Sequence, residues 1–414
     1  MITSQTRPRA SITSFKETLA GHFAGVGGLI AGLIVAWELG VFNSFSPWII
    51  AVYPTVLIVK SVMSGTFSGR INTALHIGTL SPRFSGNMGF VGRMFQRILT
   101  LTLVTSIVMS AVSTIFGSLF WGITPGNFPV ILTVVVATMS LGLTLYFFTL
   151  SITFAAFRRG LDLDGVVYPI VATIADVFIT ICYAVAVNLY FRFGSGGKSV
   201  VILVAIIPVV LILYFLSRGF HEVGFSQTIK TSILTMMIVA VIASVTGTIL
   251  QEINVGMPLW KVSSAVYPAS VFAAYPAVIE LVVDAALVIG STATTRLVLG
   301  LLEPSFFALK NHAPQILGAW AASAVAFIPL SAASLFLTHT LGLLSFCFLA
   351  SVLLVTNAFA IVAITLISYA FAILTFKKGL DPDHLVIPIE SALAATVAST
   401  ALLAALFLLT HAGG

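Results

Sequence analysis

Charge is what this chain of 414 residues has least of. Only 8% of its residues are charged, 19 lysines and arginines and 13 aspartates and glutamates, while 59% are hydrophobic. A soluble domain of this size needs far more charged side chains to cover its surface. The composition therefore predicts an all-α integral membrane protein. The net charge of +6 is typical of cytoplasmic loops in such proteins, and no nucleic acid is expected as a partner.

Cysteine is scarce, and the common sequence motifs of ATPases and hydrolases are missing. The two cysteines, Cys182 and Cys347, both lie in apolar segments, so no disulfide is expected. The sequence has no Walker A, HExxH or GxSxG motif, so we expect neither ATP hydrolysis nor membrane proteolysis, and no cofactor. The polar amino-terminal stretch lacks a cleavage-site pattern ahead of a short apolar core, and we do not expect a signal peptide.

Long apolar runs, in contrast, are abundant. A helix of about 20 apolar residues crosses a bilayer, and eleven segments meet that length or come close to it. The second span of each half is too long for one straight crossing and is expected to be tilted, broken or extended past the membrane. The expected spans are 20–39, 48–80, 98–120, 128–157, 166–190, 199–216, 231–250, 260–302, 316–337, 341–376 and 385–409.

The basic residues predict the orientation of these spans. Cytoplasmic loops of membrane proteins carry an excess of lysine and arginine. A cytoplasmic amino terminus and an extracellular carboxyl terminus, in the cell membrane, put Arg192, Lys198 and Lys261 outside. The basic residues then inside are Arg7, Arg9, Lys16, Arg83, Arg93, Arg97, Arg158, Arg159, Arg218, Lys230, Lys310, Lys377 and Lys378.

The chain contains an internal repeat. Residues 53–84 recur 222 residues later as 275–306, with Tyr, Pro, Val, Thr, Leu, Gly and Phe at matching places. A second block, RRGLDLDGVVYPI at 158–170, recurs as KKGLDPDHLVIPI at 377–389. Duplicated halves are a common architecture of membrane transporters, with the substrate path at the interface between the repeats.

The number of spans predicts how the repeats are related. Two five-span repeats joined directly would be inverted, but the unmatched sixth span returns the chain to the first face. The repeats are therefore expected to be parallel, in a monomeric pseudo-dimer. The expected division is a first five-helix repeat at 1–195, a linker transmembrane helix at 196–220 and a second five-helix repeat at 221–414.

Acidic residues inside predicted spans are the candidate functional residues. A carboxylate in lipid costs about 2.5–3.5 kcal/mol or more, so it usually faces an aqueous path or a partner. Glu280 and Asp284 are four residues apart and share one helix face, which suits a hard divalent cation and its waters. The alternative is ion pairing with Lys60, Arg70 or Arg296.

Asp176 and Glu390 are the other two candidate metal ligands. Asp176 lies one and a half turns into the fifth span, and its alternative role is a hydrogen bond to Thr173, Thr180 or Tyr183, or an ion pair with Lys60. Glu390 lies close to the cytoplasmic end of the last span, and Glu38 near an outer helix end is expected only to reach the headgroups.

Two further groups of residues concern packing and span ends. Gly65 and Gly69 form a small-xxx-small pair, typical of close helix packing or of a backbone opening along an ion path. His22, His76 and His339 lie near span ends and are expected to be interfacial, since no second histidine or cysteine stands at ligand spacing.

These residues resemble the MgtE family of magnesium transporters, including its archaeal members and its animal solute-carrier relatives. The resemblance rests on the proline-started second span, on SGRINTALHIG at 68–78, which contains Asn72, and on DLDGVVYP followed by Thr173, Asp176 and Tyr183. It implies parallel five-span modules with Asp176 as the central cation-coordinating acid, and it covers essentially the whole chain.

The two repeats depart from a symmetric version of that pattern. Asp176 aligns with Ala395, and Lys60 aligns with Val282. Conversely, Glu280 and Asp284 align with Ile58 and Val62. One site built from Asp176 together with Glu280 and Asp284 would explain both changes, with the carboxylates roughly 4–8 Å apart.

The leading prediction is therefore transport of a divalent cation, most consistently Mg²⁺, through a pathway between the two repeats. Lys60, Thr173, Gly65, Gly69 and Asn72 are expected to modulate it, and membrane lipid is the expected surrounding. The alternative is an ion-coupled secondary transporter of another small solute that uses a Lys60/Asp176 ion pair. A scaffold or intramembrane enzyme fits less well, because buried acids without a nucleophile motif suit permeation better.

Overall fold

In a computed structural model the chain is built from helices. The residues that the structure describes are 7–25, 27–83, 88–160, 168–217, 225–259, 268–378 and 387–411. Within these ranges there is no strand, and eleven helical segments are long and apolar enough to cross a membrane. The prediction of an all-α integral membrane protein is confirmed. Arg218, Lys261 and most of the two loops at 158–170 and 377–389 lie outside the described residues.

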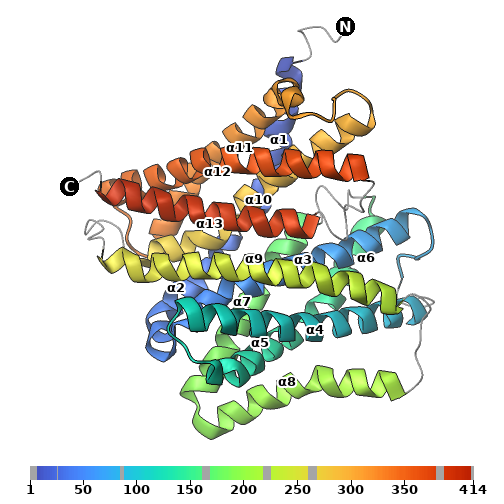
Figure 1. Ribbon diagram of the computed structural model, residues 1–414, viewed down its shortest axis with the longest axis vertical. Coiled ribbons are helices and arrows are strands. Elements are labelled where there is room, and N and C mark those ends of the chain that lie inside the picture. The colour runs from blue at the N-terminus through green and yellow to red at the C-terminus, as the bar shows by residue number, and fades with distance from the viewer. Residues whose placement is uncertain are drawn as a thin grey trace. The chain divides into compact units, whose positions relative to one another are not determined.

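The helices follow one another with short connections (Figure 1). Those of the first half are α1 (Arg7–Gly25), α2 (Gly28–Phe45), α3 (Trp48–His76), α4 (Met88–Phe120), the short η1 (Pro125–Asn127), α5 (Phe128–Gly142), α6 (Thr144–Arg158), α7 (Tyr168–Arg192) and α8 (Gly194–Ser217). Those that follow are α9 (Phe225–Leu259), α10 (Pro268–Val298), the short η3 (Phe306–Ala308), α11 (Leu309–Leu337), α12 (Leu343–Lys378) and α13 (Ile387–His411).

The long second spans are single helices. Helix α3 runs for 29 residues and α10 for 31, each with one internal proline, Pro54 and Pro276. Proline is tolerated inside membrane helices because neighbouring groups satisfy the carbonyl that loses its hydrogen bond. Of the three expected arrangements for these spans, a break is not observed within the described residues 48–76 and 268–298.

Two expected spans differ from prediction. The first, expected at 20–39, is divided between α1 and α2. The fourth contains a break between α5 and α6, at Gly142 and Leu143. Glycine weakens a helix interior, and a Cβ at Gly142 would lie 2.7 Å from Cδ1 of Ile179 on α7. The matching helix of the second half, α12, has Ile361 in place of this glycine and is continuous.

The chain forms two compact units. Unit 1 contains Met1–Trp37 and Ile249–Gly414, and unit 2 contains Glu38–Thr248. Unit 1 thus joins α1 and the start of α2 to the end of α9 and to α10–α13, as the blue amino-terminal helix beside the orange α11 shows in Figure 1. Unit 2 holds α3–α8 and most of α9. The predicted division at 195 and 220 concerns the sequence repeats and stays a prediction.

Each unit contains the first span of the other half. In unit 2, α9 approaches α3 so closely that a Cβ at Gly247 would overlap the carbonyl oxygen of Ala51. In unit 1, a Cβ at Gly32 on α2 would overlap the carbonyl oxygen of Ala273 on α10. Ala51 and Ala273 are matching residues of the two repeats. The same glycine-mediated helix contact therefore occurs twice, each time between one repeat's first span and the other repeat's second span.

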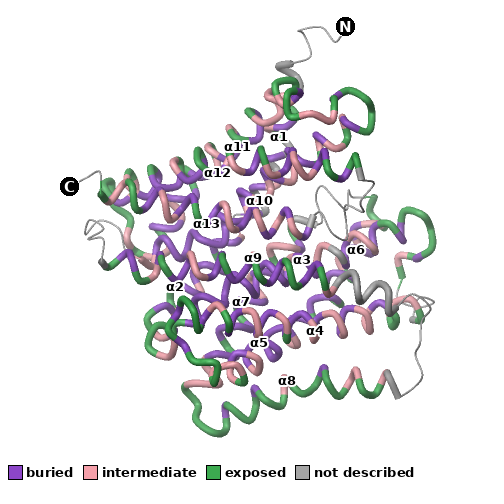
Figure 2. Tube along the Cα trace, viewed as in Figure 1, coloured by how far each residue is buried: buried purple, intermediate pink, exposed green. Residues whose placement is uncertain are grey.

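Helix α8 differs from its neighbours in burial. It packs on α4, α5 and α7 of unit 2, yet most of its length is exposed, as the green tube in Figure 2 shows. Large apolar side chains such as Leu203 and Leu213 are among those exposed. An apolar exposed surface is what a membrane helix presents to lipid. This peripheral position suits the expected role of the sixth span as a linker.

Candidate cation-binding residues

Lys60 and Asp176 form a buried ion pair in unit 2. Lys60 Nζ on α3 lies 2.7 Å from Asp176 Oδ1 on α7, and the two side chains are 4% and 6% exposed. The same ammonium donates to the carbonyl oxygen of Ala172 at 3.0 Å. Of the predicted alternatives for Asp176, the ion pair with Lys60 is the one that the structure contains.

The second carboxylate oxygen of Asp176 is unsatisfied. Oδ2 is buried and has no hydrogen-bond partner. Buried polar atoms are paired in the great majority of cases, and an orphan atom indicates strain, a functional role or an absent ion or water. Asp176 Oδ1 and the Ala172 carbonyl therefore hold the Lys60 ammonium, and the second carboxylate oxygen is left unused.

A hydroxyl relay fixes the position of Asp176. Thr180 Oγ1 donates to the backbone carbonyl of Asp176 at 2.7 Å, and Tyr53 OH lies 3.1 Å from Thr180 Oγ1. Tyr183 OH donates to the carbonyl of Ile49 at 2.6 Å. The first of these links lies within α7, and the other two join α3 to α7. The predicted alternatives Thr180 and Tyr183 thus bind backbone groups and leave the Asp176 carboxylate to Lys60.

Unit 1 contains the same relay without the charges. Tyr275 OH lies 2.8 Å from Ser399 Oγ, which donates to the carbonyl of Ala395 at 2.9 Å. Tyr275 and Ser399 match Tyr53 and Thr180, so Ala395 is the structural equivalent of Asp176 as the alignment predicts. Val282, the equivalent of Lys60, is also buried. One repeat therefore has an ion pair where the other has two apolar side chains.

Glu280 and Asp284 lie on α10, where α1 covers them. A Cβ at Gly21 would lie 3.5 Å from Asp284 Oδ2, and one at Gly25 would lie 3.6 Å from Glu280 Oε2. The two glycines, four residues apart on α1, lie against the two acids, four apart on α10. The expected shared face of these carboxylates is confirmed, and within unit 1 it meets the glycine side of α1.

The structure buries His22, which the sequence placed near a span end. Its side chain is 1% exposed, with Nδ1 3.4 Å from Asp284 Oδ2 and Nε2 2.9 Å from Ser323 Oγ. Its place directly after Gly21 was the available signal, because a small residue lets a helix approach closely. His76 and His339 are exposed, and their interfacial position stays a prediction.

Glu390 is the second fully buried acid. It lies on α13 at 5% exposure, and its Oε1 atom has no hydrogen-bond partner. A Cβ at Gly290 on α10 would lie only 2.8 Å from that atom. The space that glycine leaves open is therefore the space that the carboxylate occupies.

The residues expected to modulate a path lie on α3 and α7. Asn72 is buried, and Gly65 and Thr173 are partly buried. A Cβ at Gly69 would have no neighbour within 4 Å, so close helix packing does not explain this glycine. Asp176 belongs to unit 2 and Glu280 and Asp284 to unit 1, and their convergence in one site stays a prediction. Within the described residues, no three His, Cys, Asp or Glu side chains form a metal-binding group.

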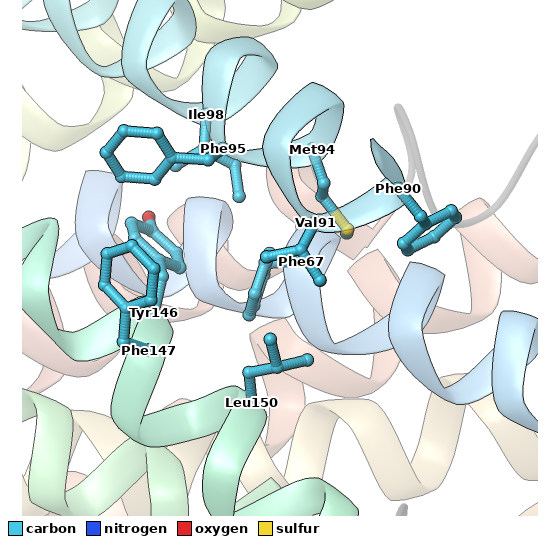
Figure 3. Close-up of a pocket in the computed structure, with 9 residues that line it drawn as sticks. All are labelled: Phe67, Phe90, Val91, Met94, Phe95, Ile98, Tyr146, Phe147 and Leu150. Carbon is cyan, nitrogen blue, oxygen red and sulfur yellow. The ribbon is translucent and has the colours of Figure 1, made fainter. Parts of the chain in front are cut away.

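A separate pocket in unit 2 is apolar. Side chains of α3, α4 and α6 line it, among them Phe67, Phe95 and Tyr146 (Figure 3). The rings of Phe67 and Tyr146 pack edge to face with centroids 4.9 Å apart. No charged side chain lines this pocket, so it offers no carboxylate to bind a cation.

Comparison with known families identifies one match. Residues 53–186 match the family described as MgtE, divalent cation transporter. The matched region begins at Tyr53 of the hydroxyl relay and includes both Lys60 and Asp176. The resemblance to MgtE is confirmed for this region, which lies within unit 2. Searches of curated proteins and of solved structures return no match.

Proposed function

From the match of residues 53–186 to the MgtE divalent cation transporters, we propose that this membrane protein transports Mg²⁺ with Asp176 as the acid that binds the ion. The observation that carries the proposal is the buried Asp176 carboxylate, with its unpartnered Oδ2 atom, inside the matched region. An acid within a membrane span is costly unless it serves an ion path or a partner. The predicted course of the path between the repeats is part of this proposal.

The chemistry around Asp176 favours a hard cation. The groups on hand are carboxylate and backbone carbonyl oxygens, which are the ligands that Mg²⁺ and Ca²⁺ take in proteins. Mg²⁺ keeps several of its waters and needs only one or two carboxylates. A single aspartate with a nearby carbonyl thus suits Mg²⁺ better than Ca²⁺, which takes six to eight oxygen ligands.

The test is Mg²⁺ flux into liposomes that contain the purified protein. We expect Asp176→Asn to reduce the flux at least about tenfold, because it keeps the shape of the side chain and removes its charge. Glu38→Gln is the matched control: Glu38 is also an acid of unit 2, but its carboxylate accepts a hydrogen bond from Asn188 at 3.1 Å, away from Lys60. Glu38→Gln should keep the flux of the wild type, and unchanged flux in Asp176→Asn would reject the assignment.

A second candidate function is ion-coupled transport of another small solute. The observation in its favour is the Lys60–Asp176 ion pair, because an opening and closing pair can couple a driving ion to movement. Thermal stability in detergent separates the two candidates. A ligand that binds the folded state raises the unfolding temperature by mass action. Stabilisation by Mg²⁺ over Na⁺ supports divalent transport, and stabilisation by Na⁺ alone supports the second candidate.

A further inference from the structure

We propose that the Lys60 ammonium is a tethered substitute for the transported cation, so that Lys60 and a divalent cation occupy the Asp176 carboxylate alternately. This inference rests on the proposed transport of divalent cations through Asp176. Lys60 then competes with the ion for Asp176, and this competition helps to determine the apparent affinity for the ion.

Oxygen atoms of α7 bind the Lys60 ammonium. The ammonium is held by Asp176 Oδ1 at 2.7 Å and by the Ala172 carbonyl at 3.0 Å, both from α7. A carboxylate oxygen and a carbonyl oxygen are also ligands of hard cations. Oδ2 of the same carboxylate is buried without a partner. The lysine thus uses part of an oxygen cluster that has capacity for a cation of higher charge.

The second repeat has no equivalent of the Lys60–Asp176 ion pair. At the equivalent place in unit 1, both charges are absent, since Val282 and Ala395 replace the lysine and the aspartate. The relay of Tyr275 and Ser399 holds the backbone there as Tyr53 and Thr180 do in unit 2. Helices α10 and α13 therefore pack together at this place without an ion pair. The ion pair of unit 2 is not needed to join α3 to α7, which leaves charge compensation as its role.

The charge of the Asp176 carboxylate must be compensated in both states. A buried carboxylate needs a compensating charge, and removing one partner of a buried pair is strongly unfavourable. Lys60 supplies that charge when no divalent cation is bound. When the cation binds, two positive groups would share one carboxylate, so the lysine must leave. An ion then binds only to the fraction of molecules in which the lysine has left. The apparent dissociation constant is therefore the intrinsic constant divided by that fraction.

The experiment measures Mg²⁺ binding by calorimetry on the purified full chain in nanodiscs. We expect Lys60→Met, which keeps the length of the side chain and removes its charge, to bind Mg²⁺ at least about tenfold more tightly than the wild type. Lys60→Arg keeps the charge and should stay within about threefold of the wild type. The tight binding should disappear in the double variant Lys60→Met/Asp176→Asn, which identifies Asp176 as its site.

Folding is controlled with a second variant and a second measurement. Lys60→Val/Asp176→Ala copies the residues of unit 1, so it should fold like the wild type and lose the Mg²⁺ flux. If Lys60→Met is unstable without Mg²⁺, its unfolding temperature should rise with Mg²⁺ more steeply than that of the wild type. A rise no larger than in the wild type overturns the inference.

The failures of the two proposals are distinguishable. If Lys60→Met binds Mg²⁺ with unchanged or weaker affinity while Asp176→Asn still abolishes flux, the inference is overturned and the proposed function stands. If the wild type and Asp176→Asn carry the same Mg²⁺ flux, the proposed function is overturned, and the inference with it.

Discussion

At the scale of single residues, the two acids that are buried among the described residues, Asp176 and Glu390, are compensated in different ways. Oδ1 of Asp176 lies 2.7 Å from Lys60 Nζ, and Oδ2 has no hydrogen-bond partner. Glu390 is accommodated by the missing side chain of Gly290. The sequence identified both acids because a carboxylate in a membrane span is rare. The residues that compensate them, Lys60 and Gly290, are distant in the sequence.

The first prediction concerns the charge pair. Asp176→Ala alone leaves the buried Lys60 ammonium without a counter-charge, and we expect the free energy of unfolding to fall by about 3–5 kcal/mol. The double variant Lys60→Val/Asp176→Ala removes both charges and should lose less than half of that. Thermal unfolding in detergent measures both variants. A double variant less stable than Asp176→Ala would show that the pair is structural.

The second prediction concerns Gly290. Gly290→Ala places a methyl group 2.8 Å from Glu390 Oε1 and should destabilise the protein by about 1–3 kcal/mol, a typical cost of overpacking. Glu390→Ala in the same chain makes room and should restore most of the loss. Gly40→Ala is the matched control, because a Cβ there meets nothing within 4 Å. Equal effects of Gly290→Ala and Gly40→Ala would contradict this account.

At the scale of elements, glycine decides which helices approach closely. Gly32 and Gly247 let α2 and α9 contact the backbone of the second span of the other repeat, at Ala273 and Ala51. Small residues at such contacts are the usual means by which membrane helices pack, since burial from lipid supplies no hydrophobic driving force. Gly142 has another effect, because it accompanies the break between α5 and α6.

We predict that Gly32→Ala and Gly247→Ala each destabilise the protein by at least about 1–3 kcal/mol. In both variants the added Cβ meets a backbone carbonyl, which cannot turn aside as a side chain can. The two losses should be similar, because the contacts occupy matching places in the repeats. Unfolding temperatures in detergent provide the comparison, again with Gly40→Ala as the control. An unchanged unfolding temperature in either variant would contradict the close helix contact at that glycine.

At the scale of the whole molecule, an odd number of spans has a direct consequence. Eleven candidate spans within the described residues agree with the number expected from the apolar runs. Odd parity puts the two ends of the chain on opposite sides of the membrane, and the excess of basic residues predicts a cytoplasmic amino terminus.

The corresponding prediction uses single cysteines. After Cys182 and Cys347 are replaced by alanine, Gly413→Cys should react with a membrane-impermeant maleimide on intact cells. Ser4→Cys should react only after the membrane is opened, which also controls for the reactivity of the thiol. Labelling of both cysteines on intact cells, or of neither, would contradict an odd number of crossings.

The sequence by itself determined the fold class, the repeat and the candidate acids. Each depends on composition, run length or self-similarity, and the lipid environment leaves an apolar segment of this length little choice but a helix. It also supplied the MgtE resemblance, confirmed for residues 53–186. It did not distinguish whether Asp176 pairs with Lys60 or hydrogen-bonds to Thr173, Thr180 or Tyr183. The last three are close in the sequence, whereas the approach of Lys60 depends on which helices pack together.

Only the tertiary structure decided the partners. Lys60 and Asp176 are 116 positions apart, and His22 and Asp284 are 262 apart. Such pairs depend on which helices lie side by side, and among membrane helices small residues and polar contacts make that choice instead of overall hydrophobicity. Each unit also contains the first span of the other half, which the hydrophobic pattern of α2 and α9 does not reveal. The structure shows that these helices approach the second spans most closely at Gly32 and Gly247.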